Sequence, residues 1–236
     1  MLAGCGAEHP AAPRAADASS SGSTTTTPSP TANPTANPTP SPSTATAPST
    51  APAGQLSRFP LALGYPTTNQ DDGSPVRVTA KPATKAFGEC GRTAWDPRSG
   101  TSEVIGVEFR GEAEWFRGRT LVLYPTVRAA QASVDRARDA ITTCPRDAGG
   151  DSGWTEHTAV DYDSGEQSFG WNDRWWETDL GGFDTGLTVY HVVRVGRAVL
   201  LTYDYGEGNG SEQTRRSALA AAEKADAPVV KVMYYL

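Results

Sequence analysis

The stretch Leu187–Tyr205, LTVYHVVRVGRAVLLTYDY, carries most of the information about the fold of this chain of 236 residues. Apolar side chains alternate with others across Leu187–Val195, as in a half-buried β-strand, and Ala198–Tyr205 has the composition of a second strand. Gly196 and Arg197 lie between them and match a two-residue hairpin turn with glycine in first position. The sequence therefore predicts an antiparallel β-hairpin over this stretch.

Further β-strands are expected on both sides of this hairpin, because the same alternation recurs. The predicted strands are Glu103–Arg110, Arg119–Tyr124, Thr155–Asp161, Gln167–Thr178 and, at the end of the chain, Val229–Tyr234. The turn residues Asp-Ser-Gly at positions 163–165 join the third and fourth of these into a second hairpin.

The first predicted helix follows the second of these strands. Thr126 can cap its N-terminus, and apolar residues then recur at spacings of three and four from Val127 to Ile141, which places them on one stripe. Pro145 cannot continue a helix and helps to end this one.

The second predicted helix can be capped by Ser211 and is expected to end near Ala225, before Pro228. The predicted order of elements is then β-β-α-β-β-β-β-α-β. Because hairpins outnumber crossovers, we expect an α+β fold: a mostly antiparallel β-sheet with two main helices packed on one face, preceded by a disordered tether.

The N-terminus resembles a targeting signal. Leu-Ala-Gly-Cys at positions 2–5 resembles the lipobox of bacterial lipoproteins, in which the cysteine becomes the first mature residue and carries the lipid. The residues before Cys5 are too few for the apolar region of a signal peptide. We therefore expect residues 1–5 to be the end of a truncated signal peptide with Cys5 as the lipidation site, and a chance match is the alternative.

Residues 6–54 consist mainly of Ala, Pro, Ser and Thr and contain no aromatic or large aliphatic side chain. Such a segment cannot bury enough apolar surface to offset the entropy lost on ordering. We expect a disordered tether that holds a folded extracellular domain, residues 55–236, on the order of 100 Å from a membrane. The composition also suits O-glycosylation.

The three cysteines fit this picture. Lipidation of Cys5 leaves Cys90 and Cys144 to form a structural disulfide in an oxidising compartment, and two buried free thiols are the alternative. Together with the lipobox, this predicts an extracytoplasmic protein that is lipid-anchored to the cell membrane.

Charge and hydropathy restrict the possible partners. The formal net charge is −6 and no basic run is present, so nucleic acid is not an expected partner. No stretch of the sequence is long and apolar enough to span a bilayer. The expected contact with the membrane is therefore the lipid anchor.

Three segments resemble a known family: Tyr124–Ala130, the helix end at Cys144-Pro145, and the hairpin Val192–Thr202. They are similar to extracellular sensor domains of the PknH type, found in a mycobacterial kinase and in actinobacterial lipoproteins, and the similarity covers residues 101–236. The resemblance implies an α+β domain with a central cleft for a small ligand. It also implies two disulfides, whereas this chain can form one, and no kinase domain is present.

Gly-Asp-Ser-Gly at positions 150–153 resembles the nucleophile segment of trypsin-like proteases, which makes Ser152 a candidate nucleophile. That family has glycine where this chain has Trp154, and a serine nucleophile needs a positioned base. We therefore expect no catalytic activity and interpret the segment as a loop before a strand. A secreted hydrolase that uses Ser152, or an acid pair such as Asp161 and Asp163, is the alternative.

Histidines and acids give no clear metal motif. His157 and His191 remain possible bases for that serine, although His191 lies among apolar residues and is expected to be a hydrogen-bonded core residue. The segment 161–165 partly matches a calcium loop, but Gly165 and Asn172 replace two ligands of the EF-hand pattern. No His, Cys or Glu group has the spacing of a zinc site. No metal and no cofactor are expected.

Aromatic residues give the better functional indication. Trp171, Arg174, Trp175 and Trp176 are the candidate ligand-binding residues. Neighbouring residues of a strand point to opposite faces, so one of Trp175 and Trp176 is expected outside the core or lining a cleft, where it could stack on a sugar ring. The alternative is that both are covered.

The sequence thus predicts a membrane-anchored extracellular sensor or ligand-binding lipoprotein domain. It would bind a small molecule or a cell-wall component in a cleft, without catalysis. The alternatives are the secreted hydrolase and a structural envelope lipoprotein that contacts other proteins.

Overall fold

The computed structural model describes residues 54–236 except 69–74, 76, 82–85, 111–115 and 208–209. Cys5 lies outside the described residues, as does the predicted tether apart from Gly54, so lipidation and the tether remain predictions. Among the described residues, no helix combines the length and the hydropathy that crossing a bilayer requires.

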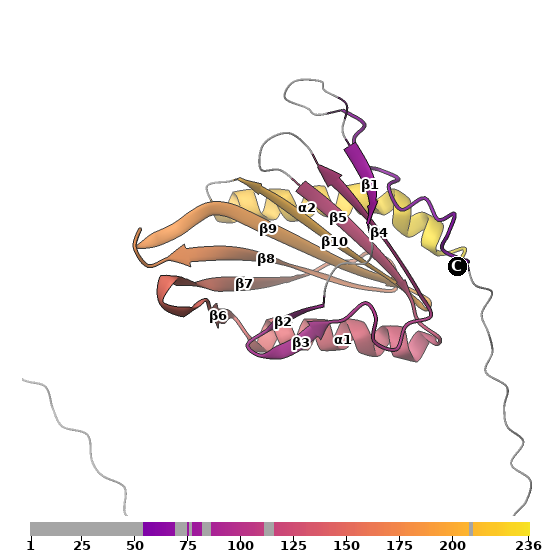
Figure 1. Cartoon of the computed structure of the whole chain (residues 1–236), viewed down its shortest axis with the longest axis horizontal. Coiled ribbons are helices and arrows are strands. Elements are labelled where there is room, and N and C mark those ends of the chain that lie inside the picture. The colour runs from indigo at the N-terminus through magenta and orange to yellow at the C-terminus, as the bar shows by residue number, and fades with distance from the viewer. Residues whose placement is uncertain (1–53, 69–74, 76, 82–85, 111–115, 208–209) are drawn as a thin grey trace, which may run out of the picture. The chain divides into compact units, whose positions relative to one another are not determined.

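One antiparallel sheet of eight strands is the framework of the domain (Figure 1). Its strands lie in the order β1-β4-β5-β10-β9-β8-β7-β6. Their bounds are β1 Arg77–Lys81, β4 Glu103–Arg110, β5 Phe116–Leu123, β6 Arg146–Ala148, β7 Gly153–Asp161, β8 Gln167–Glu177, β9 Gly182–Val195 and β10 Ala198–Glu207. The prediction of a mostly antiparallel sheet with two main helices is confirmed, although the short strands β1 and β6 were not predicted.

The hairpin of β9 and β10 is the one predicted from the sequence. Val195 pairs with Ala198, and Gly196 in the turn has a φ of 54°, a conformation that glycine adopts without steric cost. β10 also pairs with β5, which places Leu123 opposite Ala198. This second pairing joins the β4–β5 hairpin to the β6–β10 strands in one sheet.

The two helices cover opposite faces of the sheet, which corrects the expectation that both pack on one face (Figure 1). Helix α1, Val127–Thr143, packs on the face that contains Val122, and helix α2, Glu212–Met233, packs on the face that contains Leu121. Adjacent residues of a strand point to opposite faces. Since all of residues 198–201 are buried, the central strands are apolar on both faces and both faces need a cover.

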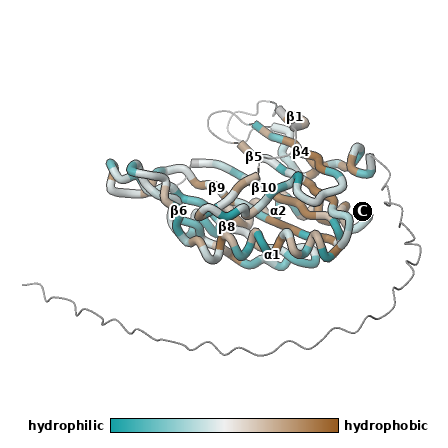
Figure 2. The backbone as a smooth tube through the Cα atoms, turned by 60° about the horizontal axis from the view of Figure 1, so that its bottom comes forward, coloured by the Kyte–Doolittle hydropathy of each residue, from teal (hydrophilic) through white to brown (hydrophobic). Residues whose placement is uncertain are grey.

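Helix α1 begins and ends as predicted. Thr126 Oγ1 accepts the backbone N–H of Ala129 at 3.1 Å, and the helix ends just before Cys144. Figure 2 shows hydrophilic and hydrophobic residues alternating along this helix. The stripe that faces the sheet consists of the buried residues Ala130, Ser133, Val134, Ala137, Ala140 and Ile141.

Helix α2 is longer than predicted. Ser211 caps it as expected, but the helix continues through Pro228 to Met233, so the predicted strand Val229–Tyr234 is wrong. A proline inside a helix costs about 3 kcal/mol, because it lacks an N–H and crowds the preceding turn. Burial of apolar side chains on both sides of the proline offsets this cost. These side chains are Leu219, Ala222, Val229, Val230 and Met233.

A charged network is buried between the sheet and α2. Asp226 of α2 accepts hydrogen bonds from Arg119 Nε and His191 Nδ1, each at 2.8 Å, and all three side chains are fully buried. Three further guanidinium N–H groups of Arg119 donate to the backbone carbonyls of Leu61, Leu63 and Ala225. His191 is therefore the hydrogen-bonded core residue that the sequence predicted.

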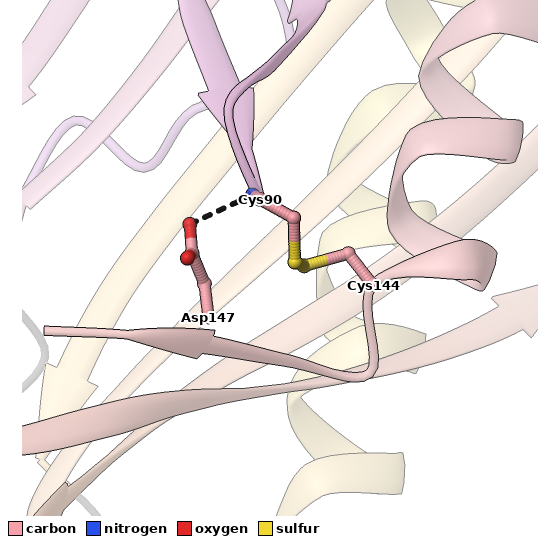
Figure 3. A group of neighbouring side chains, drawn as sticks. All are labelled: Cys90, Cys144 and Asp147. Atoms are coloured by element: carbon pink, nitrogen blue, oxygen red, sulfur yellow. Dashed lines mark hydrogen bonds between the residues drawn. A yellow bond between two sulfur atoms is a disulfide. The ribbon is translucent and has the colours of Figure 1, made fainter.

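A separate hairpin, β2 Phe87–Glu89 and β3 Arg92–Trp95, packs against α1 and was not predicted. Cys90 in its turn has a φ of 49°, which is uncommon for a residue other than glycine. It forms the predicted disulfide with Cys144, and its backbone N–H donates to Asp147 Oδ2 at 2.9 Å (Figure 3). The disulfide fixes the turn of this hairpin to the end of α1, and the hydrogen bond fixes it to β6.

Candidate functional site

The four predicted ligand-binding residues lie on β8 but do not form one site. Trp171 is completely buried, and its ring stacks on that of Tyr190 with centroids 4.4 Å apart. The Phe169 ring also stacks with this indole, with centroids 5.4 Å apart. This burial removes Trp171 from the candidates for ligand contact and makes it a core residue under α1.

Trp176 and Arg174 belong to an aromatic cluster at one end of the sheet. Trp176 stacks on Trp154 with centroids 5.6 Å apart, and Phe183 meets both rings edge-on. Arg174 lies 3.6 Å from the centroid of Phe183, and Arg146 lies 4.3 Å from that of Trp154. The rings in this cluster therefore contact one another and two guanidinium groups, and the cluster stabilises the end of the sheet.

The Gly-Asp-Ser-Gly loop packs against Trp175. A β-carbon at Gly149 or Gly153 would overlap the indole, so both positions require glycine for this contact. Ser152 ends a short 3₁₀ turn, η1 Gly150–Ser152, and its Oγ lies 3.5 Å from the carbonyl of Gly149. Within the described part of the chain Ser152 has no hydrogen bond to a histidine, so the geometry provides no base for the hydrolase alternative.

The alternative acid pair, Asp161 and Asp163, lies on the exposed surface at the end of β7. Asp161 forms an ion pair with Arg138 at 3.3 Å while 83% of its side chain is exposed. A general acid must be held beside the substrate atom that it protonates, and a carboxylate that is mostly open to solvent is not held in this way. The acid pair therefore gives the hydrolase alternative no support.

A cleft of about 520 Å³ opens between α1 and the segment that contains β3 and the turn after it. Its volume falls within the range of small-molecule sites, about 300–1,000 Å³. The residues that line it are Thr93, Ala94, Asp96, Ser99, Gly100, Tyr124, Ala129, Ala132 and Arg136. None of the four residues predicted from β8 is among them.

The cleft combines a buried phenol with two opposite charges. Tyr124 Oη is hydrogen-bonded to Ser133 Oγ at 2.6 Å, and burial raises the pKa of Tyr124. Asp96 is half-buried, and its Oδ1 accepts the backbone N–H of Arg98 at 2.9 Å, which fixes the carboxylate. The exposed Arg136 and Asp96 both act electrostatically on the Tyr124 hydroxyl. The cleft can therefore orient a small polar molecule that carries both charges.

Sequence reasoning missed this cleft because its residues come from three separate segments. Asp96 follows β3, Tyr124 follows β5, and Arg136 lies in the middle of α1. No local motif connects them. The one sequence signal was Tyr124 at the start of the segment that resembles the sensor-domain family.

Comparison with known proteins gives a weak similarity to a solved structure. No family model matches the chain, and no curated protein matches it. Among solved structures, the chain is similar to the extracellular domain of PknH from Mycobacterium tuberculosis, with 14% sequence identity and a TM-score of 0.44. The match covers 67% of this chain and 87% of that chain. The similarity is weak, and both the resemblance to the sensor-domain family and membership of a lipoprotein family remain predictions.

Proposed function

We propose that this protein is a non-catalytic extracytoplasmic domain that binds a small polar molecule or a cell-wall fragment in the cleft between α1 and β3. The observation that carries the proposal is the cleft itself, where Asp96, Arg136 and Tyr124 surround one concave volume. A few convergent polar groups in a concave site are what fixes a small ligand in one orientation. The paired charges favour a ligand with both an amino and a carboxyl group.

Location outside the cytoplasm and lipid anchoring are part of this proposal. The lipobox at Cys5 and the composition of residues 6–54 support them. The disulfide between Cys90 and Cys144 adds support, because such bonds persist in oxidising compartments. A domain on a long tether would meet the cell wall, whose peptide-bearing glycans carry both charges.

A binding assay with the oxidised full chain tests the proposal. The probe is a soluble muropeptide, a disaccharide that carries a short zwitterionic peptide, followed by thermal shift and by native mass spectrometry. We expect a saturable rise in Tm with one bound probe per chain. Arg136→Gln, which changes an exposed side chain of the cleft, should weaken binding about tenfold by removing one charge-assisted contact.

The matched control is Arg128→Gln, since Arg128 is also exposed on α1 but does not line the cleft. This variant should bind the probe like the unmodified chain. If Arg136→Gln and Arg128→Gln weaken binding of the probe equally, the probe does not bind in the cleft. Absence of any shift across muropeptides, free amino acids and sugars would contradict the proposal and favour a structural envelope protein.

A further inference from the structure

A second cluster of chemically active side chains lies away from the cleft lining, where hairpin β2–β3 meets the sheet. Glu89 is the last residue of β2, and His157 on β7 pairs with Asp173 on β8. The His157 side chain is only 1% exposed, whereas Glu89 and Asp173 each retain 16% exposure. The imidazole is therefore buried, and solvent reaches the cluster at the carboxylates.

Asp173 fixes the orientation of the imidazole. His157 Nδ1 lies 2.7 Å from Asp173 Oδ1 in a hydrogen bond. With its N–H directed at this carboxylate, the ring presents Nε2 to Glu89. A carboxylate that holds the far nitrogen of a metal-binding histidine is the usual outer support of such ligands, because it sets both tautomer and ring orientation.

The second nitrogen is left without a hydrogen bond. His157 Nε2 is buried and lies 3.2 Å from Glu89 Oε2, an ion-pair distance when the ring is protonated, but the geometry is not that of a hydrogen bond. Two donor atoms that each lie about 2.1 Å from one zinc ion are roughly 3.0–3.4 Å apart, for angles between octahedral and tetrahedral. The separation of these two atoms is thus that of two ligands of one metal ion.

The cluster also has an excess of negative charge. Within the described residues, the only cationic group within ion-pair distance of Glu89 or Asp173 is the imidazole itself. Two carboxylates thus face one imidazole. A divalent cation between them would bring more positive charge to the cluster than a proton does.

We propose that Glu89 and His157 Nε2 bind a divalent transition-metal ion of the zinc type, with Asp173 as the positioning residue and water in the open coordination positions. An imidazole nitrogen beside a carboxylate favours zinc over calcium or magnesium, which prefer all-oxygen sites. Binding replaces the proton on His157, which leaves to solvent. The ion would link the β2–β3 hairpin to β7, next to the disulfide at Cys90.

Zinc titration of the chelator-treated, oxidised full chain by calorimetry tests this proposal, with calcium as the contrasting ion. We expect one zinc ion per chain and no calcium binding. Glu89→Gln should abolish zinc binding or weaken it at least tenfold, and it leaves a neutral side chain of the same size. Asp147→Asn is the matched control, because Asp147 contacts the same hairpin turn but lies outside the cluster, and it should bind zinc like the unmodified chain.

Two further measurements keep the test decisive if Glu89→Gln does not fold. Asp173→Asn should weaken zinc binding about 10–100-fold and change the visible spectrum of bound Co²⁺, because the imidazole loses its support. In NMR spectra of the unmodified chain, zinc should shift the imidazole signals of His157 and leave those of His191 unchanged. Absence of zinc binding, binding that Glu89→Gln leaves intact, or a shift confined to His9 would each overturn the proposal.

Discussion

His191 and His157 are both buried, and each forms a hydrogen bond through Nδ1 to an aspartate, at 2.8 Å and 2.7 Å. They lie on opposite faces of the sheet, and the charges around them differ. Asp226, the partner of His191, is shared with Arg119, and no part of the three side chains reaches solvent. Asp173, the partner of His157, is joined by Glu89, and both carboxylates are partly exposed.

The comparison shows that a His–Asp pair has no fixed role of its own. With an added arginine and complete burial, the pair becomes part of the connection between α2 and the sheet. With an added glutamate and access to solvent, the same pair attracts a cation. A structural His–Asp pair thus differs from one in a candidate site by the charged group beside it and by its exposure to solvent.

The largest expected effect on the unfolding free energy comes from Asp226→Asn, which removes the carboxylate that His191 and Arg119 share. The change leaves the Arg119 guanidinium buried without a carboxylate, and loss of one partner of a buried ion pair typically costs about 3–5 kcal/mol of unfolding free energy. Urea unfolding measures this loss. Asp173→Asn in metal-free protein should cost clearly less, and equal losses in the two variants would contradict the distinction between the two pairs.

Loss of the disulfide should disturb the cluster around His157 and destabilise the domain. The double variant Cys90→Ser, Cys144→Ser releases the turn next to Glu89 and is expected to lower the unfolding free energy by about 2–4 kcal/mol. Because Glu89 is then no longer held beside His157, zinc affinity should fall as well. Unchanged zinc affinity in the folded double variant would show that the hairpin is positioned without the disulfide.

The pH dependence of stability sharpens the comparison. The pKa of His157 is about 10 in the folded chain against roughly 6.5 when unfolded, so the folded state binds the proton more tightly. The stabilisation is complete below about pH 6.5 and is lost as the pH rises towards about 10. Burial also raises the pKa of Asp173, which makes stability fall with rising pH in the acidic range.

Urea unfolding of metal-free protein between pH 6 and pH 10 measures this dependence. Glu89→Gln should flatten the curve, because one of the two carboxylates that raise the pKa of His157 is gone. If the unfolding free energy of this variant falls with pH at the same slope, His157 is not the group that causes the dependence.

The smallest effect concerns the helices that cover the two faces. Thr126→Ala removes the hydrogen bond from Ala129 N–H at the start of α1 and should lower the unfolding free energy by about 1 kcal/mol. Ser211→Ala does the same for α2, by way of Thr214 N–H. We expect urea unfolding to show similar losses for the two variants. A loss larger than that of Asp226→Asn would mean that helix caps contribute more to the unfolding free energy than the buried charges do.

Much of the fold could be predicted from local patterns in the sequence. The β9–β10 hairpin and α1 follow from alternation and spacing, and the caps Thr126 and Ser211 from their side chains. The side of the sheet on which each helix packs could not be predicted in this way. Runs such as residues 198–201 are apolar on both faces. Pro228 predicts the end of a helix, but burial of the side chains around it sustains the helix.

The sites were predicted less well, because their residues are brought together only by the fold. The sequence places Trp171 among the candidate ligand-binding residues, but β8 is buried on both faces at that position. Glu89 lies in a strand of three residues that leaves almost no pattern, and it meets His157 only through the hairpin. The sequence shows that aromatic and charged side chains are present. Which of these side chains contact one another depends on the register of the paired strands.

The pairing of β5 with β10 determines the expected order of folding. These strands are separated in the chain by α1 and four other strands, whereas β4 and β5, like the strands from β7 to β10, follow one another closely in the sequence. Contacts between residues distant in sequence form slowly, because a long loop must close first. The two local groups of strands should therefore form early and remain unjoined for a time, with the edge strands β5 and β10 not yet paired. During that interval a second copy of the chain can pair with either edge, so exchange of strands between copies is the misfolding route that this topology favours.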